Sequence, residues 1–305
     1  MNSFFVELKG FEIVLVAGPD AEKFLQGQLS CDVQALADNG FTYGAACNNK
    51  GRIFAAFILA RHGTDFRVLL AAGLAQVFVA NLQKFIPFYK CSMQIQSGLK
   101  SIGLAGSAIV ETLERLDQQI PASGSGREEA GVSLYNLQAD NTQFLLVADE
   151  SAYPAIRSAL SSFIPEAPCE RWELTNAVAG HFPFSAEDVD KYTPQELHLD
   201  KAGYVSFTKG CYTGQEIIAR MHYRGKVKKR LYLLQIANFT RPENEIEILD
   251  GDNDKLGSPI KLIPYEHTLF AIASLPVALT GTNLHTKEGE SISYQPLTAD
   301  VGVDS

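Results

Sequence analysis

The hydrophobic positions in the first half of the chain repeat one arrangement. An apolar run rich in Val, Ile and Leu leads into a small-residue turn and then into apolar positions at helical spacing. The pattern occurs in FEIVLVAGPDAEKFLQGQL, FRVLLAAGLAQVFVANLQKF, SIGLAGSAIVETLERL and FLLVADESAYPAIRSAL, while RIFAAFILAR and VSLYNLQ read as further strands. Strands and helices mixed in this way, without strict alternation, predict duplicated α+β units of split βαβ type. The turns lie at Ala17–Gly18, Ala72–Gly73, Ala105–Gly106 and Asp149.

The hydrophobic pattern changes after Arg230. LYLLQIANF, IEIL, SPIKLIPY, LFAIASLPVAL and ISYQPL are short apolar runs separated by turn residues, which is typical of a small β-barrel or sandwich. DGDNDKLG, at 250–257, lacks the sixth-position glycine and twelfth-position acid of a calcium loop, so it predicts a hairpin turn. PASGSGREEA, at 121–130, reads as an exposed loop.

The composition is that of an ordinary globular protein. The chain has 305 residues, 46% hydrophobic and 20% charged, which allows two or three domains with real cores. Its five cysteines show no CxxC pattern, so we expect a reducing compartment and neither a zinc nor an iron–sulfur site held by one chain. MNSFFVELKG lacks the basic region of a signal peptide, and no apolar run is long enough to span a bilayer. We therefore predict a cytoplasmic protein without a membrane partner.

Positive charge is concentrated in one segment of an acidic chain. The net charge is −9, yet six of the eleven residues from 220 to 230 are basic. This run is either a solvated face that balances acidic neighbours or a local site for phosphate, polyglutamate or an RNA backbone. The six residues are Arg220, Arg224, Lys226, Lys228, Lys229 and Arg230.

The stretch that precedes this run combines a thiol with a helix start. Thr213 and Glu216 form a T-x-x-E capping box, which predicts a helix from Thr213. Cys211 lies two residues earlier, where the helix N-terminus and Lys209 would favour a thiolate and Glu216 would oppose it. The flanking Gly210 allows a tight turn and the close approach of another molecule. The thiol is either reactive or a small side chain that packs at the helix entrance.

KGCYTGQE, at 209–216, resembles the signature of the YgfZ-type folate-binding proteins, which are relatives of the glycine-cleavage-system aminomethyltransferase. The resemblance extends to GPDAEKFLQGQLSCDV (18–33), CNNKGRI (47–53), ERWELTNAVAGHFP (170–183) and PQELHLDKAGYVSFTKG (194–210). It implies an α+β fold, a ring of two ferredoxin-like α+β domains and a C-terminal small β-barrel around a tetrahydrofolate. We expect a discontinuous folate-site domain (1–50 with about 165–225), a second α+β domain (51–164) and the barrel (226–305).

The resemblance also implies the folate contacts. Trp172, the single tryptophan, and Phe11 match two aromatic positions of the family, and an aromatic face suits a planar pterin or aminobenzoyl ring. Tyr204 and Arg220 complete the expected folate-binding set. Filling of the core is the alternative role for Trp172.

Two departures from the family pattern bear on function. Ala55 and Ala56 stand where the aminomethyltransferases carry paired aspartates, which argues against glycine cleavage and leaves enzyme activity open. Val178 replaces a glutamate that can hydrogen-bond the pterin, which weakens the usual anchoring.

The residues and the resemblance together leave three functions open. The first is a tetrahydrofolate-binding accessory protein for assembly or repair of iron–sulfur enzymes, including those that modify tRNA, with Cys211 as the key residue. Its partners would be folate, iron–sulfur enzymes or their assembly factors, and indirectly tRNA. The second is a folate-dependent one-carbon (aminomethyl) transferase. The third is a non-catalytic module that docks protein or RNA and that folate regulates.

Overall fold

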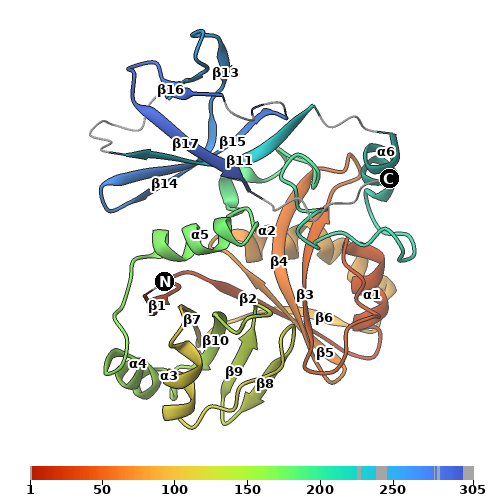
Figure 1. Cartoon of the computed structure of the whole chain (residues 1–305). Coiled ribbons are helices and arrows are strands. Elements are labelled where there is room, and N and C mark those ends of the chain that lie inside the picture. The colour runs from red at the N-terminus through yellow and green to blue at the C-terminus, as the bar shows by residue number, and fades with distance from the viewer. Residues whose placement is uncertain (1, 225–227, 238–245, 278, 280–281, 298–305) are drawn as a thin grey trace. The chain divides into compact units, whose positions relative to one another are not determined.

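The computed structural model describes residues 2–224, 228–237, 246–277, 279 and 282–297 (Figure 1). The chain divides into two compact units. The N-terminal unit comprises Met1–Trp172, Phe184–Pro194 and Gly203–Ala219, and the C-terminal unit comprises Glu173–Pro183, Gln195–Ala202 and Arg220–Ser305. Two of the limits between them fall within the helices α5 (Cys169–Val178) and α6 (Gln215–Arg224).

The N-terminal unit contains two five-stranded sheets whose neighbouring strands are antiparallel. The first sheet has the order β3 (Phe41–Cys47), β4 (Ile53–His62), β5 (Asp65–Leu70), β2 (Glu12–Ala17), β6 (Ser92–Gln96). The second sheet has the order β1 (Phe4–Glu7), β7 (Leu99–Ala105), β10 (Gln143–Asp149), β9 (Val132–Asn136), β8 (Gly126–Glu129).

All four predicted strand–turn–helix units are confirmed. In the first sheet β2 leads into α1 (Ala21–Gln28) and β5 into α2 (Leu74–Leu82), which continues as the 3-10 helix η1 (Gln83–Phe88). In the second sheet β7 leads into α3 (Ile109–Arg115) and β10 into α4 (Tyr153–Ser161). RIFAAFILAR and VSLYNLQ form β4 and β9, also as predicted.

The predicted duplication is visible in the order of the strands. The first sheet and its helices follow the sequence β2-α1-β3-β4-β5-α2-β6, and the second sheet repeats it as β7-α3-β8-β9-β10-α4, with the N-terminal strand β1 at the edge that β6 occupies in the first. Gly18 and Gly106, with φ of +121° and +125°, mark equivalent turns. A Cβ at Gly18 would lie 2.6 Å from the carbonyl oxygen of Lys90, just before β6, and one at Gly106 would lie 2.4 Å from Ser3, just before β1. Only glycine fits these two turns, because the conformation is left-handed and another backbone approaches closely.

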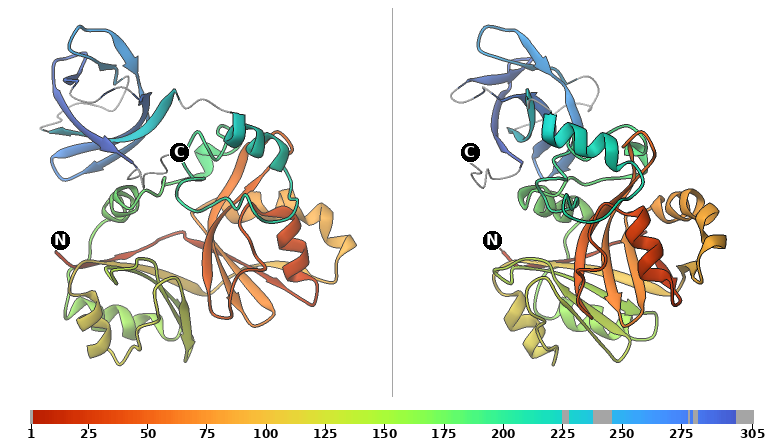
Figure 2. Two further views of the ribbon diagram at one scale, coloured as in Figure 1. Left: turned by 45° about the vertical axis from the view of Figure 1, so that its right-hand side comes forward. Right: turned by 90° about the vertical axis from the view of Figure 1, so that its right-hand side faces the viewer.

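The two sheets pack face to face, and helices cover their outer faces. Side chains of both sheets share one buried cluster, which includes Val6, Ile58, Leu69 and Leu145. The helices α3 and α4 cover the outer face of the second sheet (Figure 2). They bury a further cluster with strand residues such as Phe144. The helices α1 and α2 contact β5, β2 and β4 on the outer face of the first sheet. The N-terminal unit is therefore a four-layer α-β-β-α structure, in which alternate residues of each strand face different layers.

The C-terminal unit contains one antiparallel seven-stranded sheet that curls around its own apolar cluster (Figure 2). The predicted β-rich texture and the hairpin turn within 250–257 are confirmed, since β12 pairs with β13 on either side of that turn. The sheet order is β13 (Lys255–Gly257), β12 (Ile248–Leu249), β16 (Leu284–Thr286), β17 (Ser291–Pro296), β11 (Lys229–Ala237), β15 (Thr268–Pro276), β14 (Pro259–Tyr265).

Two local predictions are corrected. Helix α6 begins at Gln215 rather than at Thr213, because Gly214 adopts φ +86°, outside the right-handed helical region. The Thr213 hydroxyl donates to Gln28 Oε1 instead of serving a capping box. Residues 121–130, expected to be a loop throughout, include strand β8, which pairs with β9. The three domain limits drawn from the family resemblance stay a prediction, and the first sheet joins strands from both sides of residue 50.

Candidate functional site

Cys211 lies on an exposed loop whose neighbouring side chains are buried. The thiol is exposed, whereas the Tyr212 ring is only 7% exposed. An added Cβ at Gly210 would meet no atom within 4 Å, so the loop is open to solvent on that side. Glu216 is exposed in the first turn of α6. The sequence predicted this glycine-flanked loop, and the structure places its thiol where another molecule can reach it.

The loop is bonded to the segment that follows α1. The Ser206 N–H donates to the Ser30 carbonyl over 2.9 Å, and the Ser30 hydroxyl donates to the Tyr204 carbonyl over 2.6 Å. Beyond Cys211, the Thr213 N–H donates to the Gly27 carbonyl over 3.3 Å. Residues about 180 positions apart in sequence are therefore joined on both sides of the thiol.

The turn of the CNNKGRI segment packs against the start of α6. A Cβ at Gly214 would lie 2.6 Å from the Asn48 carbonyl oxygen, and one at Gly51 would lie 3.1 Å from the Ile217 side chain. Asn48 also donates through Nδ2 to the Asp190 carboxylate over 2.8 Å. The segments 47–53 and 209–216, which the sequence analysis identified separately, thus pack against each other.

The thiols near this loop differ in exposure. Cys31 and Cys47 are buried, at 2% and 1% exposed. Burial raises the pKa of the Cys31 thiol to about 12 and raises the pKa of Cys47 as well. Both side chains therefore remain protonated at neutral pH, and only an exposed thiol is available to a partner. Cys211 and Cys169 are the exposed cysteines of this chain.

Lys209, predicted to act on Cys211, is 8% exposed and directs its ammonium toward α1. The Nζ atom donates hydrogen bonds to the carbonyl oxygens of Gln26, Leu29 and Cys31. Burial lowers the pKa of Lys209 to about 8, and the charge interactions with Cys31 and Asp32 act in the opposite direction. Its tuning of the thiol, like that by Glu216, stays a prediction.

The expected folate residues Phe11 and Trp172 both belong to the cluster between the two sheets, Trp172 as a buried member and Phe11 packed against it. Trp172 is 6% exposed, and a Cβ at Gly103 would lie 2.5 Å from its Cε3 atom, so the indole packs directly on the β7 backbone. This contact gives Trp172 the core-filling role that the sequence left open. Contact of its ring with folate stays a prediction.

Half-buried aromatic rings line the edge of the same cluster. Phe11, Phe41 and Tyr43 pack against it while keeping part of their surface exposed. The Tyr43 and Tyr204 rings lie 5.1 Å apart, centroid to centroid, with 32° between their planes. Partly exposed rings suit the planar portion of a folate, so the residues present fit that group by stacking. No sequence pattern marked Phe41 or Tyr43, because they are ordinary apolar positions of a strand.

The positions that depart from the aminomethyltransferase pattern lie on β4. Ala55 is buried on the helix-covered side, and Ala56 alternates to the face that carries Ile58 and is paired with β3. Neither residue can act as an acid or a base. Val178 is 50% exposed at the end of α5.

The predicted basic segment is described only in part. Arg220 is exposed on α6, Lys228 and Lys229 are exposed, and Arg230 is half-buried on β11. Lys226 lies outside the described residues, as does the side chain of Arg224. Arg220 belongs to the C-terminal unit, and Phe11, Trp172 and Tyr204 to the N-terminal unit.

Within the described ranges, no three His, Cys, Asp or Glu side chains gather as metal ligands would. No helix in those ranges combines the length and the apolar character that crossing a membrane requires.

The comparisons with known proteins define first a class and then a family. Residues 4–126 match the model of the GCVT N-terminal domain. The glycine cleavage system aminomethyltransferase T from Bartonella henselae superimposes with a TM-score of 0.77 over 97% of this chain and 86% of its own, at 18% identity. The fold is therefore that of the aminomethyltransferase class.

Relatives with curated names identify the family. The tRNA-modifying protein YgfZ of Colwellia psychrerythraea is 30% identical over 83% of this chain and 78% of its own length. That of Aliivibrio fischeri is 31% identical over 90% and 86%. The chain belongs to the YgfZ family.

Proposed function

We propose that the chain is a tetrahydrofolate-binding accessory protein of the cytoplasm that supports assembly or repair of iron–sulfur enzymes, including enzymes that modify tRNA. Cys211 acts in this role by transient contact with the labile sulfur or iron of a partner. A single thiol cannot hold a cluster alone, so the partner supplies the remaining ligands. The partners are iron–sulfur enzymes or their assembly factors, and tRNA is involved through those enzymes.

One observation carries the proposal: Cys211 is exposed on a loop anchored on both sides, while Cys31 and Cys47 are buried beneath it. Family membership supports it, because the relatives are named as tRNA-modifying proteins. Aminomethyl transfer is disfavoured by the methyl groups of Ala55 and Ala56, which offer no carboxylate to a one-carbon unit.

The test compares two exposed cysteines. In a strain that lacks the endogenous counterpart, Cys211→Ser at normal expression should fail to restore iron–sulfur enzyme activities and tRNA thiolation. The matched control, Cys169→Ser, removes the other exposed thiol and should restore both. Full restoration by Cys211→Ser would sink the proposed thiol role and leave the non-catalytic docking module as the function.

Folate binding has its own measurement. Trp172 is the single tryptophan, so tetrahydrofolate bound at the adjoining rings should change its fluorescence. Phe11→Leu and Tyr43→Leu should each weaken binding roughly tenfold, by analogy with the loss of about 1–3 kcal/mol per stacked base. Phe88→Leu alters an aromatic side chain that is 80% exposed outside this cluster, and it should bind as the unaltered chain does. Equal affinity in all three variants would contradict the assignment.

A further inference from the structure

Helix α1 ends without a cation of its own. It has no basic residue in its last turn, and its chain leaves through Leu29 in an extended conformation. The last carbonyl groups of a helix have no partner within the helix, and they form the negative end of its dipole. A cation or another set of donors must therefore come from elsewhere in the chain.

Lys209 supplies three donors from a distant segment, one to the last turn of α1 and two to the residues that follow it. Its Nζ lies 2.7 Å from the Gln26 oxygen, 2.7 Å from the Leu29 oxygen and 2.8 Å from the Cys31 oxygen. An ammonium group has three N–H donors, and each of them has an acceptor here. The ammonium also lies 5.1 Å from the centre of the Tyr212 ring, within the range of a cation–π contact. The ammonium group of Lys209 therefore contacts the end of α1 and the ring of Tyr212, the residue after Cys211.

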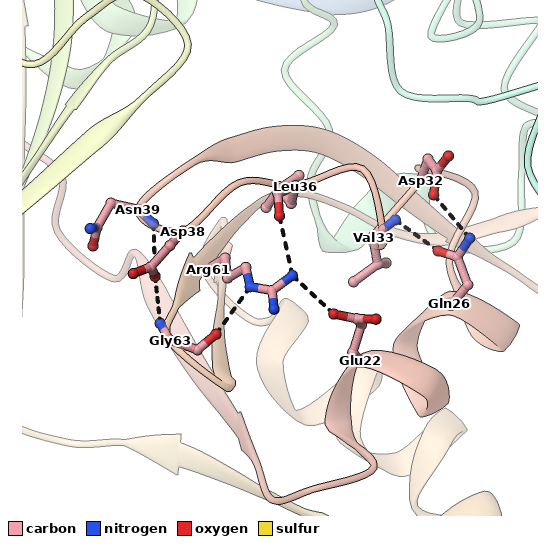
Figure 3. Close-up of polar contacts among 9 residues, drawn as sticks. All are labelled: Glu22, Gln26, Asp32, Val33, Leu36, Asp38, Asn39, Arg61 and Gly63. Atoms are coloured by element: carbon pink, nitrogen blue, oxygen red, sulfur yellow. Dashed lines mark hydrogen bonds and ion pairs between the residues drawn. The ribbon is translucent and has the colours of Figure 1, made fainter.

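The segment that accepts these bonds is itself braced (Figure 3). The Gln26 side chain donates to the Asp32 carboxylate over 2.9 Å and accepts from the Val33 N–H over 2.8 Å. Further along the same loop, Arg61 donates to the Leu36 carbonyl oxygen and to the Glu22 carboxylate. Lys209 is therefore bonded to a part of the unit that is fixed at several points.

We infer that Lys209 is a positioning residue, whose ammonium clamps the loop 206–213 onto the C-terminal end of α1 and so sets where Cys211 is presented. The inference rests on the proposed function of Cys211 for its biological meaning, but the clamp itself does not depend on that function. It departs from the expectation that Lys209 acts on the thiol through its charge, because its donors are all directed at carbonyl oxygens.

The experiment removes the donors and keeps the side-chain length. Lys209→Met should raise hydrogen–deuterium exchange at the Ser206 and Thr213 amides at least tenfold, while amides of β9 and β10 keep their rates. Lys50→Met removes an exposed lysine of the neighbouring turn and should change neither set. Unchanged exchange at Ser206 and Thr213 in a folded Lys209→Met protein would overturn the inference.

A second measurement separates position from charge. A charge acting through space is screened by salt, since the Debye length falls to about 3 Å at 1 M. The measurement is the alkylation rate of Cys211 divided by that of Cys169, in Lys209→Met and in the unaltered chain. If Lys209 positions the loop, the difference between the two proteins should persist at high salt. A difference that disappears at high salt, with unchanged amide exchange, would restore the electrostatic role.

Two further outcomes keep the test decisive. If Lys209→Met fails to fold, Thr213→Val loosens the other side of the loop and keeps the ammonium. It should then raise exchange at the Thr213 amide more than at Ser206, and equal exchange at both would contradict two separate anchors. If Cys211→Ser restores function fully while Lys209→Met loosens the loop, the proposed function fails and the clamp stands.

Discussion

The two halves of the N-terminal unit close equivalent helices in different ways. Helix α3, in the second half, ends on its own residues: the Leu116 and Gln118 amides donate back to the Leu113 carbonyl, and Asp117 takes φ +54°. It also carries Arg115 in its last turn. Helix α1, in the first half, has no left-handed residue after its end and no basic residue in its last turn. Among the described residues that follow it, only the Leu29 amide donates back to its carbonyl groups, and donors from Lys209 and Thr213 bond to its remaining end. A duplicated fold thus keeps one copy self-contained and leaves the other open to a later segment of the chain.

A second difference concerns the strands that precede these helices. Counted back from the equivalent turns, Leu15 of β2 corresponds to Gly103 of β7. The missing side chain at Gly103 makes room for Trp172, which packs on that backbone. Each half is therefore contacted by one residue from later in the chain. Lys209 donates hydrogen bonds to the first half, and Trp172 packs its ring on the second. Burial of a large aromatic ring contributes more to stability than a hydrogen bond at a loop.

The largest effect on the free energy of unfolding is expected at Trp172, whose ring fills the space beside Gly103 in the second half. Trp172→Ala should lower the free energy of unfolding by about 3–5 kcal/mol, because it empties a buried site between the sheets. Chemical denaturation, followed by circular dichroism since the variant lacks tryptophan, measures this. A loss below about 1 kcal/mol would mean that the indole does not fill the core.

Adding a methyl group at Gly103 tests the same contact with Trp172 from the strand side. A Cβ at residue 103 would lie 2.5 Å from the indole, so Gly103→Ala should destabilise the protein by about 1–3 kcal/mol. The same change in a Trp172→Ala background should cost much less, since the clashing ring is gone. Additive costs in the double variant would show that the two residues do not share this contact.

An acid-sensitive contact links the two halves, and its effect is expected to be smaller. His62, from β4, lies 3.0 Å from the Glu128 carboxylate of β8 and 2.9 Å from the Tyr135 hydroxyl of β9. Burial, together with Arg67, lowers the pKa of His62 and outweighs the opposite effect of Glu128. The folded state therefore favours the neutral imidazole.

Because that pKa is lower in the folded chain, the stability it contributes is present above the ordinary value near 6.5 and is lost as pH falls below it. Denaturation curves between about pH 7 and pH 5 should show a flatter decline in His62→Gln than in the unaltered chain. His267→Gln, an exposed histidine of the C-terminal unit, is the control. Identical pH profiles for all three proteins would contradict the assignment.

The smallest effect is expected at the self-contained helix. Arg115 pairs with Glu111 one turn earlier, and its side chain is 56% exposed. Arg115→Ala should therefore lower the free energy of unfolding by only about 0.2–0.5 kcal/mol and leave amide exchange after α3 within about twofold. A larger loss would mean that α3, like α1, depends on a single cation for its C-terminal end.

The sequence determined the local structure of this protein because that structure depends on neighbours along the chain. Apolar periodicity and the small-residue turns predicted all four strand–turn–helix units, the duplication and the β-rich C-terminal region. The glycine-flanked thiol in KGCYTGQE was visible as a motif. The capping box at Thr213 was one exception, because the left-handed Gly214 delays the helix and Thr213 bonds to Gln28 instead. The segment 121–130, read as a loop, was another, since it contains strand β8.

Which distant groups meet depends on how the sheets and helices pack in the folded chain. The donors of Lys209 are bonded at the end of a helix about 180 residues away, which its sequence neighbours did not indicate, and its action on Cys211 stays a prediction. Trp172 packs on Gly103, a position whose empty space has no signature in sequence, and stacking of its ring on a ligand stays a prediction. A buried donor goes to whichever acceptor the fold brings within about 3 Å, and a ring goes to whichever surface lacks a side chain. Both conditions arise only after the sheets and helices have packed.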